Sequence, residues 1–331
     1  MKKNLLILMT LFTVVIGYSQ TTFTDANFIE YEVINNFTPY TVQVKSYDLI
    51  NGGTAVNIPT TVIYNSITYA VTGIGESAFD NKAITNVYIP SGVTFIGNYA
   101  FRSTLLTEVT MPDTVMQIGL LSFIDNSQLT NVTLSSNLSL IPTAAFQGCA
   151  ITNVTIPNSV TNIGANAFRN NQLTSITIPA NVVIVNSGAF YGNPLTSVTS
   201  VKTTAPSVTY DPTNDSFSSN RSGINLIIPI GSTTSYNVYG WFGFASVTES
   251  TLSASGFEVD NDIKVITTPE AIKIVASNSV RFQNYTIYNI SGAKVAIGSQ
   301  SEIATSSFAS GIYILKLDFD KGTVSKKVAI N

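Results

Sequence analysis

A phenylalanine recurs along this chain of 331 residues at an almost constant interval. Successive positions lie 22, 22, 23, 22 and 22 residues apart, at Phe79, Phe101, Phe123, Phe146, Phe168 and Phe190. A fixed period between about 20 and 50 residues is typical of stacked-repeat proteins. In register, each repeat reads Leu/Ile-Thr-x-Val-x-Ile-Pro and then Val-x-x-Ile-Gly-x-x-Ala-Phe. The sequence therefore predicts a mainly β solenoid of about six repeats over residues 71–200.

The first half of each repeat predicts a strand. Its Val-x-Ile core, as in Val154-Thr155-Ile156, alternates apolar and polar residues, which is typical of a half-buried strand. A proline follows in most copies and ends the strand, because it cannot donate to a hydrogen-bonded ladder. One coil cannot bury its own apolar face, so neighbouring coils are expected to stack through a parallel sheet, with the phenylalanines as an interior column.

The second half of each repeat brings four apolar groups into the interior of the coil. The glycine between them occurs at four copies and is expected to adopt a positive φ in a tight turn: Gly75, Gly97, Gly119 and Gly164. Cys149 is the single cysteine and falls where other repeats carry Asn126, Asn171 or Asn193. It is therefore expected to be a small buried group bonded to the turn backbone; the alternatives are a reactive thiol or an intermolecular bridge.

The overall composition narrows the possible functions. The net charge is −3 and Lys plus Arg total 16, so no electrostatic footprint for nucleic acid is present. Histidine is absent, which removes the commonest general base and the commonest metal ligand. Asp211 and Asp215 lack the spacing of a calcium loop and are interpreted as a polar loop. The chain is expected to be no enzyme and to need no cofactor or metal.

The N-terminus has the features of an export signal. Lys2 and Lys3 precede an apolar stretch over residues 5–16, and small residues at 17 and 19 fit a cleavage site. Residues 1–19 are therefore interpreted as a signal peptide. The apolar run is too short to be assigned as a bilayer span.

The repeat pattern resembles the leucine-rich repeats of the BspA-like surface proteins, whose consensus runs Leu-x-x-Val-x-Ile-Pro and then Val-x-x-Ile-Gly-x-x-Ala-Phe-x-x-Cys/Asn. The resemblance covers residues 71–200. The flanks resemble that family's N-terminal cap over residues 20–70 and its closing unit over residues 201–250. An adhesion role is what this resemblance implies, whereas the periodicity by itself indicates a scaffold.

The charges return after about residue 251, where short β-rich runs separated by turn signals predict a small antiparallel β-sandwich over residues 251–331. Its motifs resemble the C-terminal sorting domain of the type IX secretion system, through Gly292, Lys294, Gly311, Tyr313, Lys326 and Lys327. The resemblance implies the type IX machinery and a sorting peptidase as partners, and a product that is anchored to lipopolysaccharide or released. The location would be secreted or on the outer-membrane surface of a Gram-negative bacterium. The alternative is an ordinary carbohydrate-binding or linker sandwich.

Outward-facing residues of the predicted strands form two columns. We take both columns as a candidate ligand face: Asn86, Glu108, Asn131, Asn153, Ser175 and Ser197, with Tyr88, Thr110, Thr133, Thr155, Thr177 and Thr199. Threonine ladders also stabilise sheets without any ligand, which is the structural interpretation of the same pattern. The functional interpretation is a surface for a repeating extracellular glycan or protein.

Three hypotheses follow. The first is an adhesin-like binding module, the second a purely structural component of a surface layer or matrix, and the third a carboxylate-based glycosidase. The third requires two facing acids roughly 5 to 10 Å apart. Glu108 is the only acid on the predicted face, which argues against it.

Overall fold

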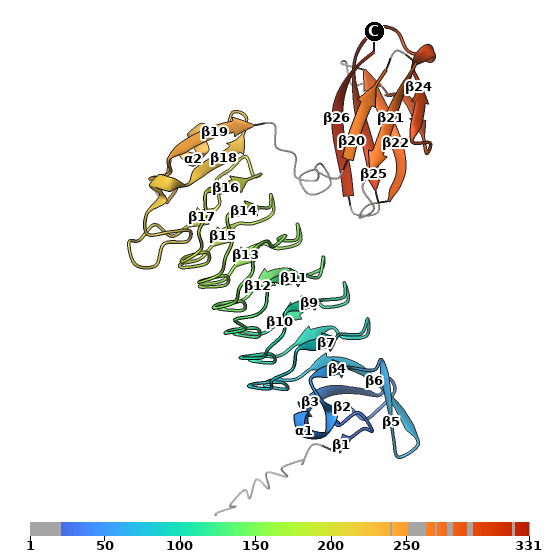
Figure 1. Cartoon of the computed structure of the whole chain (residues 1–331), viewed down its shortest axis with the longest axis vertical. Helices are drawn as coiled ribbons and strands as arrows, with labels where there is room; N and C mark the ends of the chain where they lie inside the picture. Colours follow the sequence, from blue (N-terminus) through green and yellow to red (C-terminus); the bar gives the residue numbers. More distant parts are fainter. Residues whose placement is uncertain are drawn as a thin grey trace, which may run out of the picture.

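The computed structural model describes residues 21–238, 240–250, 263–268, 270–276, 281–289, 294–319 and 322–330. The predicted signal peptide lies outside the described residues. The chain folds into a β-solenoid capped at both ends and a small β-sandwich, as Figure 1 shows. One hydrophobic core runs without a break from Ile29 in the N-terminal cap to Trp241 in the C-terminal cap, and a second core lies in the sandwich.

The N-terminal cap closes the first coil with antiparallel strands. Its elements are β1 (Thr22–Thr24), β2 (Ile29–Asn35), β3 (Thr41–Tyr47), α1 (Leu49–Gly52), β4 (Ala55–Asn57), β5 (Thr61–Tyr64) and β6 (Ile67–Ile74). Strands β1, β2 and β3 pair antiparallel, and β3 then pairs parallel with β6. Asp48 caps α1 by accepting from the backbone amides of Ile50 and Asn51. The change from antiparallel to parallel pairing at β3–β6 is where the cap becomes the solenoid.

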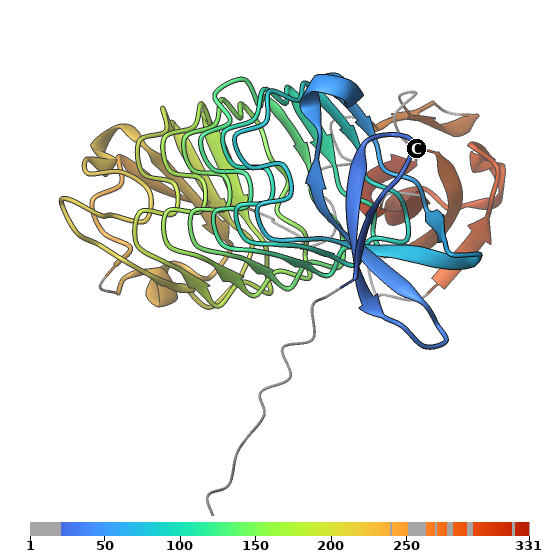
Figure 2. The same cartoon turned by 90° about the horizontal axis from the view of Figure 1, so that it is seen from below.

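The coils carry two rows of parallel strands, called here the first and the second sheet, and each row is divided into shorter hydrogen-bonded ladders. Seen from below, the coils follow the same path one behind another (Figure 2). The first sheet contains most of the predicted Val-x-Ile strands: β7 (Asn86–Tyr88), β9 (Glu108–Thr110), β11 (Asn131–Thr133), β14 (Ser175–Ile178) and β16 (Ser197–Ser200). The prediction of a strand at Val154-Thr155-Ile156 is wrong, because this coil makes only an isolated bridge, between Asn153 and Asn131. The second sheet consists of two-residue strands that the sequence did not indicate: β8 (Phe95–Ile96), β10 (Gln117–Ile118), β12 (Leu140–Ile141), β13 (Asn162–Ile163), β15 (Ile184–Val185) and β17 (Ser207–Val208).

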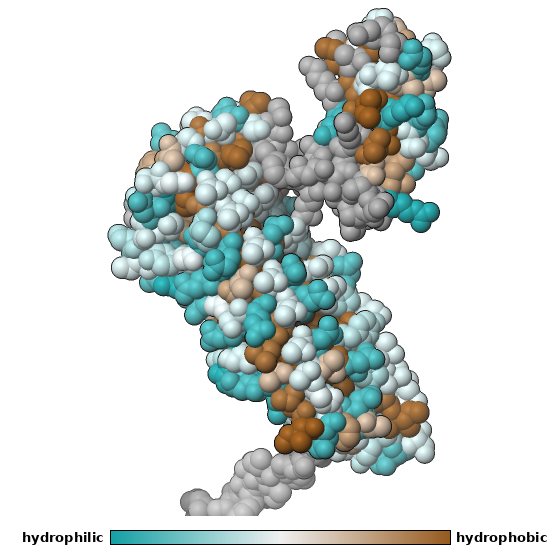
Figure 3. Space-filling view, in the orientation of Figure 1, coloured by the Kyte–Doolittle hydropathy of each residue, from teal (hydrophilic) through white to brown (hydrophobic). Residues whose placement is uncertain are grey.

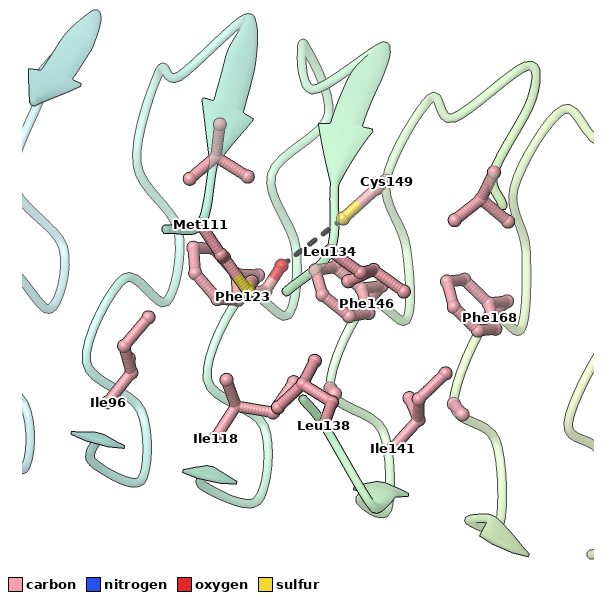
Figure 4. Packing of buried hydrophobic residues seen from close by; sticks show 14 of the residues in the cluster. Ile96, Met111, Ile118, Phe123, Leu134, Leu138, Ile141, Phe146, Cys149 and Phe168 are labelled. Carbon is pink, nitrogen blue, oxygen red and sulfur yellow. Dashed lines mark hydrogen bonds between the residues drawn. The ribbon is translucent and has the colours of Figure 1, made fainter. Parts of the chain in front are cut away.

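The phenylalanine column is confirmed as the interior of the solenoid. Its members are fully buried, and Phe217 extends the column beyond the predicted six: Phe79, Phe101, Phe123, Phe146, Phe168, Phe190 and Phe217. Neighbouring ring centroids lie 5.0 to 6.0 Å apart with nearly parallel planes. Figure 4 shows three of these rings, Phe123, Phe146 and Phe168, lined up along the solenoid axis. Val109, Val154 and Ile176, the first apolar residues of the Val-x-Ile segments, are buried beside the rings, and Val132 is half-buried.

Three residues after the phenylalanine, a small polar group bonds to the backbone of the turn, as expected, at Asn126, Cys149, Asn171 and Asn193. Asn126 donates to the carbonyls of Phe101 and Phe123, at 2.8 Å each. Cys149 takes this position in its own coil, where its thiol donates to the Phe123 carbonyl over 3.2 Å (Figure 4). Burial raises the pKa of the Cys149 thiol to about 12. The thiol is therefore a structural group in the core.

The prediction that the repeat glycines adopt a positive φ is wrong. Gly75, Gly97, Gly119 and Gly164 do not have a positive φ; the left-handed residues lie two positions later, for example Tyr99 at φ 54°. A Cβ on Gly97 would lie 2.6 Å from the backbone nitrogen of Glu76 in the preceding coil. The glycine is required because adjacent coils approach closely there, and not because the turn is tight.

The C-terminal cap continues the first sheet and covers its last coil. Its elements are η1 (Arg221–Gly223), β18 (Asn225–Pro229), α2 (Thr233–Tyr236) and β19 (Ser246–Ser250). Asp215, expected in a polar loop, is instead buried and ion-paired with Arg221 at 2.8 Å. The guanidinium also lies about 5 Å from the ring centroids of Phe217 and Phe244, so the pair fixes the cap to the end of the phenylalanine column.

The C-terminal unit is the predicted antiparallel β-sandwich. Its strands and short helix are β20 (Ile263–Thr267), β21 (Ala271–Ala276), β22 (Phe282–Asn289), β23 (Lys294–Gly298), β24 (Glu302–Ala304), η3 (Thr305–Ser307), β25 (Gly311–Phe319) and β26 (Gly322–Ile330). One sheet has the order β20-β21-β24 and the other β23-β22-β25-β26. Ile272 and Ile303 from the three-stranded sheet pack in one core with Ile287 and Leu315 from the four-stranded sheet.

Candidate ligand-binding surface

The outward side of the first sheet, which we call the strand face, carries the predicted columns in register. Asn131 pairs with Glu108 and Thr133 with Thr110, while Asn131 also bridges to Asn153. The two columns therefore run along successive coils, one mainly of asparagine and serine and the other mainly of threonine. On the side of the solenoid that Figure 3 shows, hydrophilic and intermediate residues cover most of the surface.

Most of the predicted face residues are accessible. Asn86, Tyr88, Glu108, Thr110, Asn131, Thr133, Asn153, Thr155 and Ser175 are exposed, and Thr177 and Ser197 are half-buried. Thr199 is only 5% exposed, so its inclusion in the face is wrong. Beside it, the Ser200 hydroxyl accepts a 2.6 Å hydrogen bond from Tyr236 of the C-terminal cap. The accessible part of the strand face therefore runs from β7 to Ser197 at the start of β16.

A third column of outward residues, which is not part of the predicted face, lies just before the strands. Some of its threonine hydroxyls form hydrogen bonds within the protein. The Thr130 hydroxyl donates to the Thr107 carbonyl at 3.2 Å, and Thr196 donates to Thr174 at 3.1 Å. Within the part of the chain that the structure describes, the hydroxyls of Thr133 and Thr155 have no such protein partner. The fold therefore leaves the Thr133 and Thr155 hydroxyls available to bind something else.

A depression of about 390 Å³ lies in the strand face between β7 and β9. Four predicted face residues line it, Asn86, Tyr88, Glu108 and Thr110, together with Pro112 and the buried residues of the two strands. Strands β7 and β9 are neighbours, but among the described residues no parallel ladder joins them, whereas β7 pairs with β4 and β9 with β11. The open ladder makes this the place where the face is hollowed.

A second depression of about 200 Å³ lies at the N-terminal end of the same sheet. Residues of β4 line it together with Phe28, which is 40% exposed and has a φ of 62°. Because β4 pairs with β7, both depressions border the first strands of the strand face. Neither depression can be predicted from the sequence, because each depends on how neighbouring elements meet.

The second sheet presents a different outer surface. Met116 and Val183 are each 57% exposed and Leu140 is 44% exposed, among threonine, serine and asparagine. No charged residue stands at the outward positions 72–73, 94–95, 116–117, 139–140, 161–162 and 183–184. Its outward residues do not form matched polar ladders like those of the strand face.

Neither surface has the donor set of a metal centre. No group of three or more acidic, cysteine or histidine residues that could hold a metal ion occurs among the described residues. Glu108 is the single acid among the predicted face residues. The strand face presents hydroxyls, amides, one carboxylate and one exposed aromatic ring, which can form hydrogen bonds and stacking contacts with a ligand.

Most of the predicted sorting-motif residues lie in the larger sheet of the sandwich. Lys294 begins β23, Gly311 begins β25, and Lys326 and Lys327 pair with Leu315 and Ile314. Tyr313 is buried and its hydroxyl donates to the Ala309 carbonyl at 2.8 Å. Gly292 lies outside the described residues. Tyr313 therefore has a packing role in the sandwich.

Comparisons with known proteins agree with both parts of the fold. The model for the BspA type leucine-rich repeat region matches residues 57–173, 94–222 and 139–263, which together span more than half of the chain. The chain therefore belongs to the BspA-type leucine-rich repeat family. Residues 268–331 match the secretion system C-terminal sorting domain, so the chain carries a type IX sorting domain and is a secreted or cell-surface protein.

Several solved structures are similar to this chain. The pneumococcal vaccine antigen PcpA is 13% identical with a TM-score of 0.40, over 70% of this chain and 99% of that one. A leucine-rich repeat protein from Bacteroides capillosus is 29% identical with a TM-score of 0.28, over 43% of this chain and 86% of that one. One from Eubacterium ventriosum is 22% identical with a TM-score of 0.41, over 54% and 52%. A search of curated proteins gives no match.

The described helices are short. None of them is long and apolar enough to cross a membrane.

Proposed function

We propose that the exported protein is an adhesin-like binding module that holds an extracellular polymer, a glycan or a protein, along the strand face. The observation that carries this proposal is the register of outward hydroxyl and amide groups over successive coils, with threonine hydroxyls that the fold does not use. A polymer that contacts several coils gains from weak contacts held at one effective concentration. Such binding would depend little on salt, because the face has almost no charge.

The experiment places the same three charges on either side of the same three coils. The test variant changes Thr133, Thr155 and Thr177 on the strand face to Lys; the control variant changes Ser139, Thr161 and Val183 on the second sheet to Lys. The intact protein, tested against a panel of polysaccharides and matrix proteins, should bind a partner that the test variant loses and the control retains. Equal melting temperatures would show that both variants remain folded.

The proposal fails if the test variant binds as well as the parent does. If the protein is a purely structural surface component, the parent should bind none of the polysaccharides or matrix proteins. A carboxylate-based enzyme predicts product release from the polysaccharides, which Glu108→Gln would abolish.

Processing is a further part of the proposal. The sorting domain supports removal of residues 1–19 and most of 252–331 during export, by a signal peptidase and a sorting peptidase. Intact-mass measurement of protein from the native host, in the medium and on the outer membrane, should find the shortened chain. Added mass from lipopolysaccharide on the cell-bound form would identify the anchor, and a full-length C-terminus outside the cell would contradict this route.

A further inference from the structure

Tyr88 differs in residue type from the other members of its column. The following coils carry threonine at this position, whereas Tyr88 is 56% exposed and lines the depression between β7 and β9. The fold does not require a ring there, because the side chain points away from the core. An exposed aromatic ring beside a hollow presents a flat apolar platform with a partial negative charge on its face.

The other groups around Tyr88 are neutral, apart from one acid. Asn86 and Thr110 both donate and accept hydrogen bonds, and Glu108 accepts through two oxygens. Hydrogen bonds from hydroxyl groups to an ionised carboxylate are stronger than those between neutral groups. The lining contains no Lys or Arg, so a negatively charged ligand would meet Glu108 without a compensating cation.

We infer that this depression is a subsite for one sugar unit of a neutral polysaccharide. The C–H face of the ring stacks on Tyr88, and adjacent hydroxyls donate to Glu108 while Asn86 and Thr110 complete the contacts. A pyranose has this combination of an apolar face and a rim of hydroxyls. The inference rests on the proposed function and adds to it the ligand class and the coil where binding is strongest; the remaining threonine ladder would contact further sugar units.

A cationic peptide is the other ligand that a tyrosine and a carboxylate can hold, through a cation–π contact and an ion pair. The neutral sugar is favoured because Glu108 stands alone, and the rest of the ladder consists of groups that both donate and accept. The two ligands differ in their salt dependence. Binding of a neutral sugar changes little with ionic strength, while an exposed ion pair weakens.

The test measures binding by calorimetry on the intact protein at 50 and 300 mM salt. The probes are hexasaccharides of β-1,4-glucose, α-1,4-glucose, β-1,4-mannose and β-1,4-xylose, and a lysine-rich decapeptide. Tyr88→Thr installs the residue that the following coils carry at this exposed position, so we expect the fold to be preserved. Phe37→Thr removes a ring that is 78% exposed in the N-terminal cap and serves as the matched control.

At least one hexasaccharide should bind, with little change between the two salt concentrations. Tyr88→Thr should weaken that binding about tenfold or more, Glu108→Gln should weaken it severalfold, and Phe37→Thr should leave it unchanged. Three results would overturn the subsite. The parent could bind only the peptide, it could bind no hexasaccharide, or Tyr88→Thr could bind the hexasaccharide as tightly as the parent does. If Tyr88→Thr binds normally while the strand-face lysine variant does not, the subsite is wrong and the proposed function stands; if both bind normally, both fail.

Discussion

The interior and the exterior of the same coils follow different rules. Inside, the phenylalanine column is fully buried at every member from Phe79 to Phe217. Outside, the neighbouring column changes from Tyr88, which is 56% exposed, through threonines to Thr199, which is 5% exposed. An interior ring contacts the rings of both adjacent coils, so the residue type is fixed by packing. An outward residue has fewer such constraints, so a departure like Tyr88 is more informative about binding than about folding.

The largest effect is expected where an interior ring is removed. Phe146→Ala deletes a side chain that stacks on Phe123 and Phe168 at 5.2 and 5.3 Å and leaves a cavity in the middle of the solenoid. We expect a loss of about 3 to 5 kcal/mol in the free energy of unfolding. Thr155→Ala in the same repeat should change it by less than about 0.5 kcal/mol. Chemical denaturation of both variants checks this, and similar losses would end the distinction between interior and exterior.

A smaller effect is expected at the contact between coils. In Gly97→Ala the new Cβ would meet the backbone of Glu76 and Gly75, which cannot rotate away as a side chain can. We expect a loss of about 1 to 3 kcal/mol, as for other overpacked sites. Gly97→Asn separates the two explanations of this glycine. Asparagine tolerates a positive φ, so a mild effect of Gly97→Asn would favour the turn, while a loss at least as large as that of alanine supports close approach.

The sequence predicted the interior well because the packing of a solenoid repeats with the chain. The phenylalanines, the Val-x-Ile strands and the buried position of Cys149 all follow from one period. Phe217 was missed because 27 residues separate it from Phe190, so the period is broken there. The second sheet was missed because its two-residue strands are too short to show any alternation.

The glycines show a further limit of sequence interpretation. A positive φ and a close approach of two backbones select the same residue, so the pattern cannot distinguish them. The candidate site was only partly predictable for a related reason. The columns that include Tyr88 and Glu108 follow from strand alternation, but the depression depends on β7 and β9 lying side by side without a ladder, which is a tertiary feature.

The interior position of Cys149 predicts a pH effect. Its pKa is about 12 in the folded chain, against an ordinary value near 9, so the unfolded chain loses the proton first. The contribution of the protonated Cys149 thiol to the free energy of unfolding is therefore fully present below about pH 9 and is lost as the pH rises toward 12. Between pH 8 and pH 10 the parent should lose on the order of 1 kcal/mol more stability than Cys149→Ser. Denaturation at both pH values measures the difference.

The same burial predicts slow chemistry at Cys149. A thiol reagent should react with the native protein at pH 8 far more slowly than with the unfolded protein, since the thiolate is the nucleophile. Mass spectrometry over time, with and without denaturant, follows the reaction. Rapid labelling of the native protein would place Cys149 at the surface and contradict the expected closing of the turn.

A small gain in stability is expected where the interior of the solenoid contains a buried hydroxyl without a partner. Ser122 precedes Phe123 and is fully buried, and its hydroxyl has no hydrogen-bond partner among the described residues. Other coils carry alanine at this position, as in Ala100 and Ala145. A buried hydroxyl without a partner costs free energy, so Ser122→Ala should stabilise the protein by about 1 kcal/mol. Thermal and chemical denaturation measure the gain.

Ser216 is the matched control, because it precedes Phe217 and is buried in the same column. Its single hydroxyl proton is shared between the Val185 carbonyl at 2.9 Å and the Asn186 carbonyl at 3.1 Å, and its oxygen accepts from the backbone amide of Thr209 at 2.8 Å. Ser216→Ala removes these interactions and should destabilise by about 1 kcal/mol, opposite in sign to Ser122→Ala. Equal effects at both positions would mean that the hydroxyl of Ser122 finds a partner, such as an ordered water. Opposite effects would show that a buried hydroxyl in the solenoid carries a cost unless the fold supplies it with a hydrogen-bond partner.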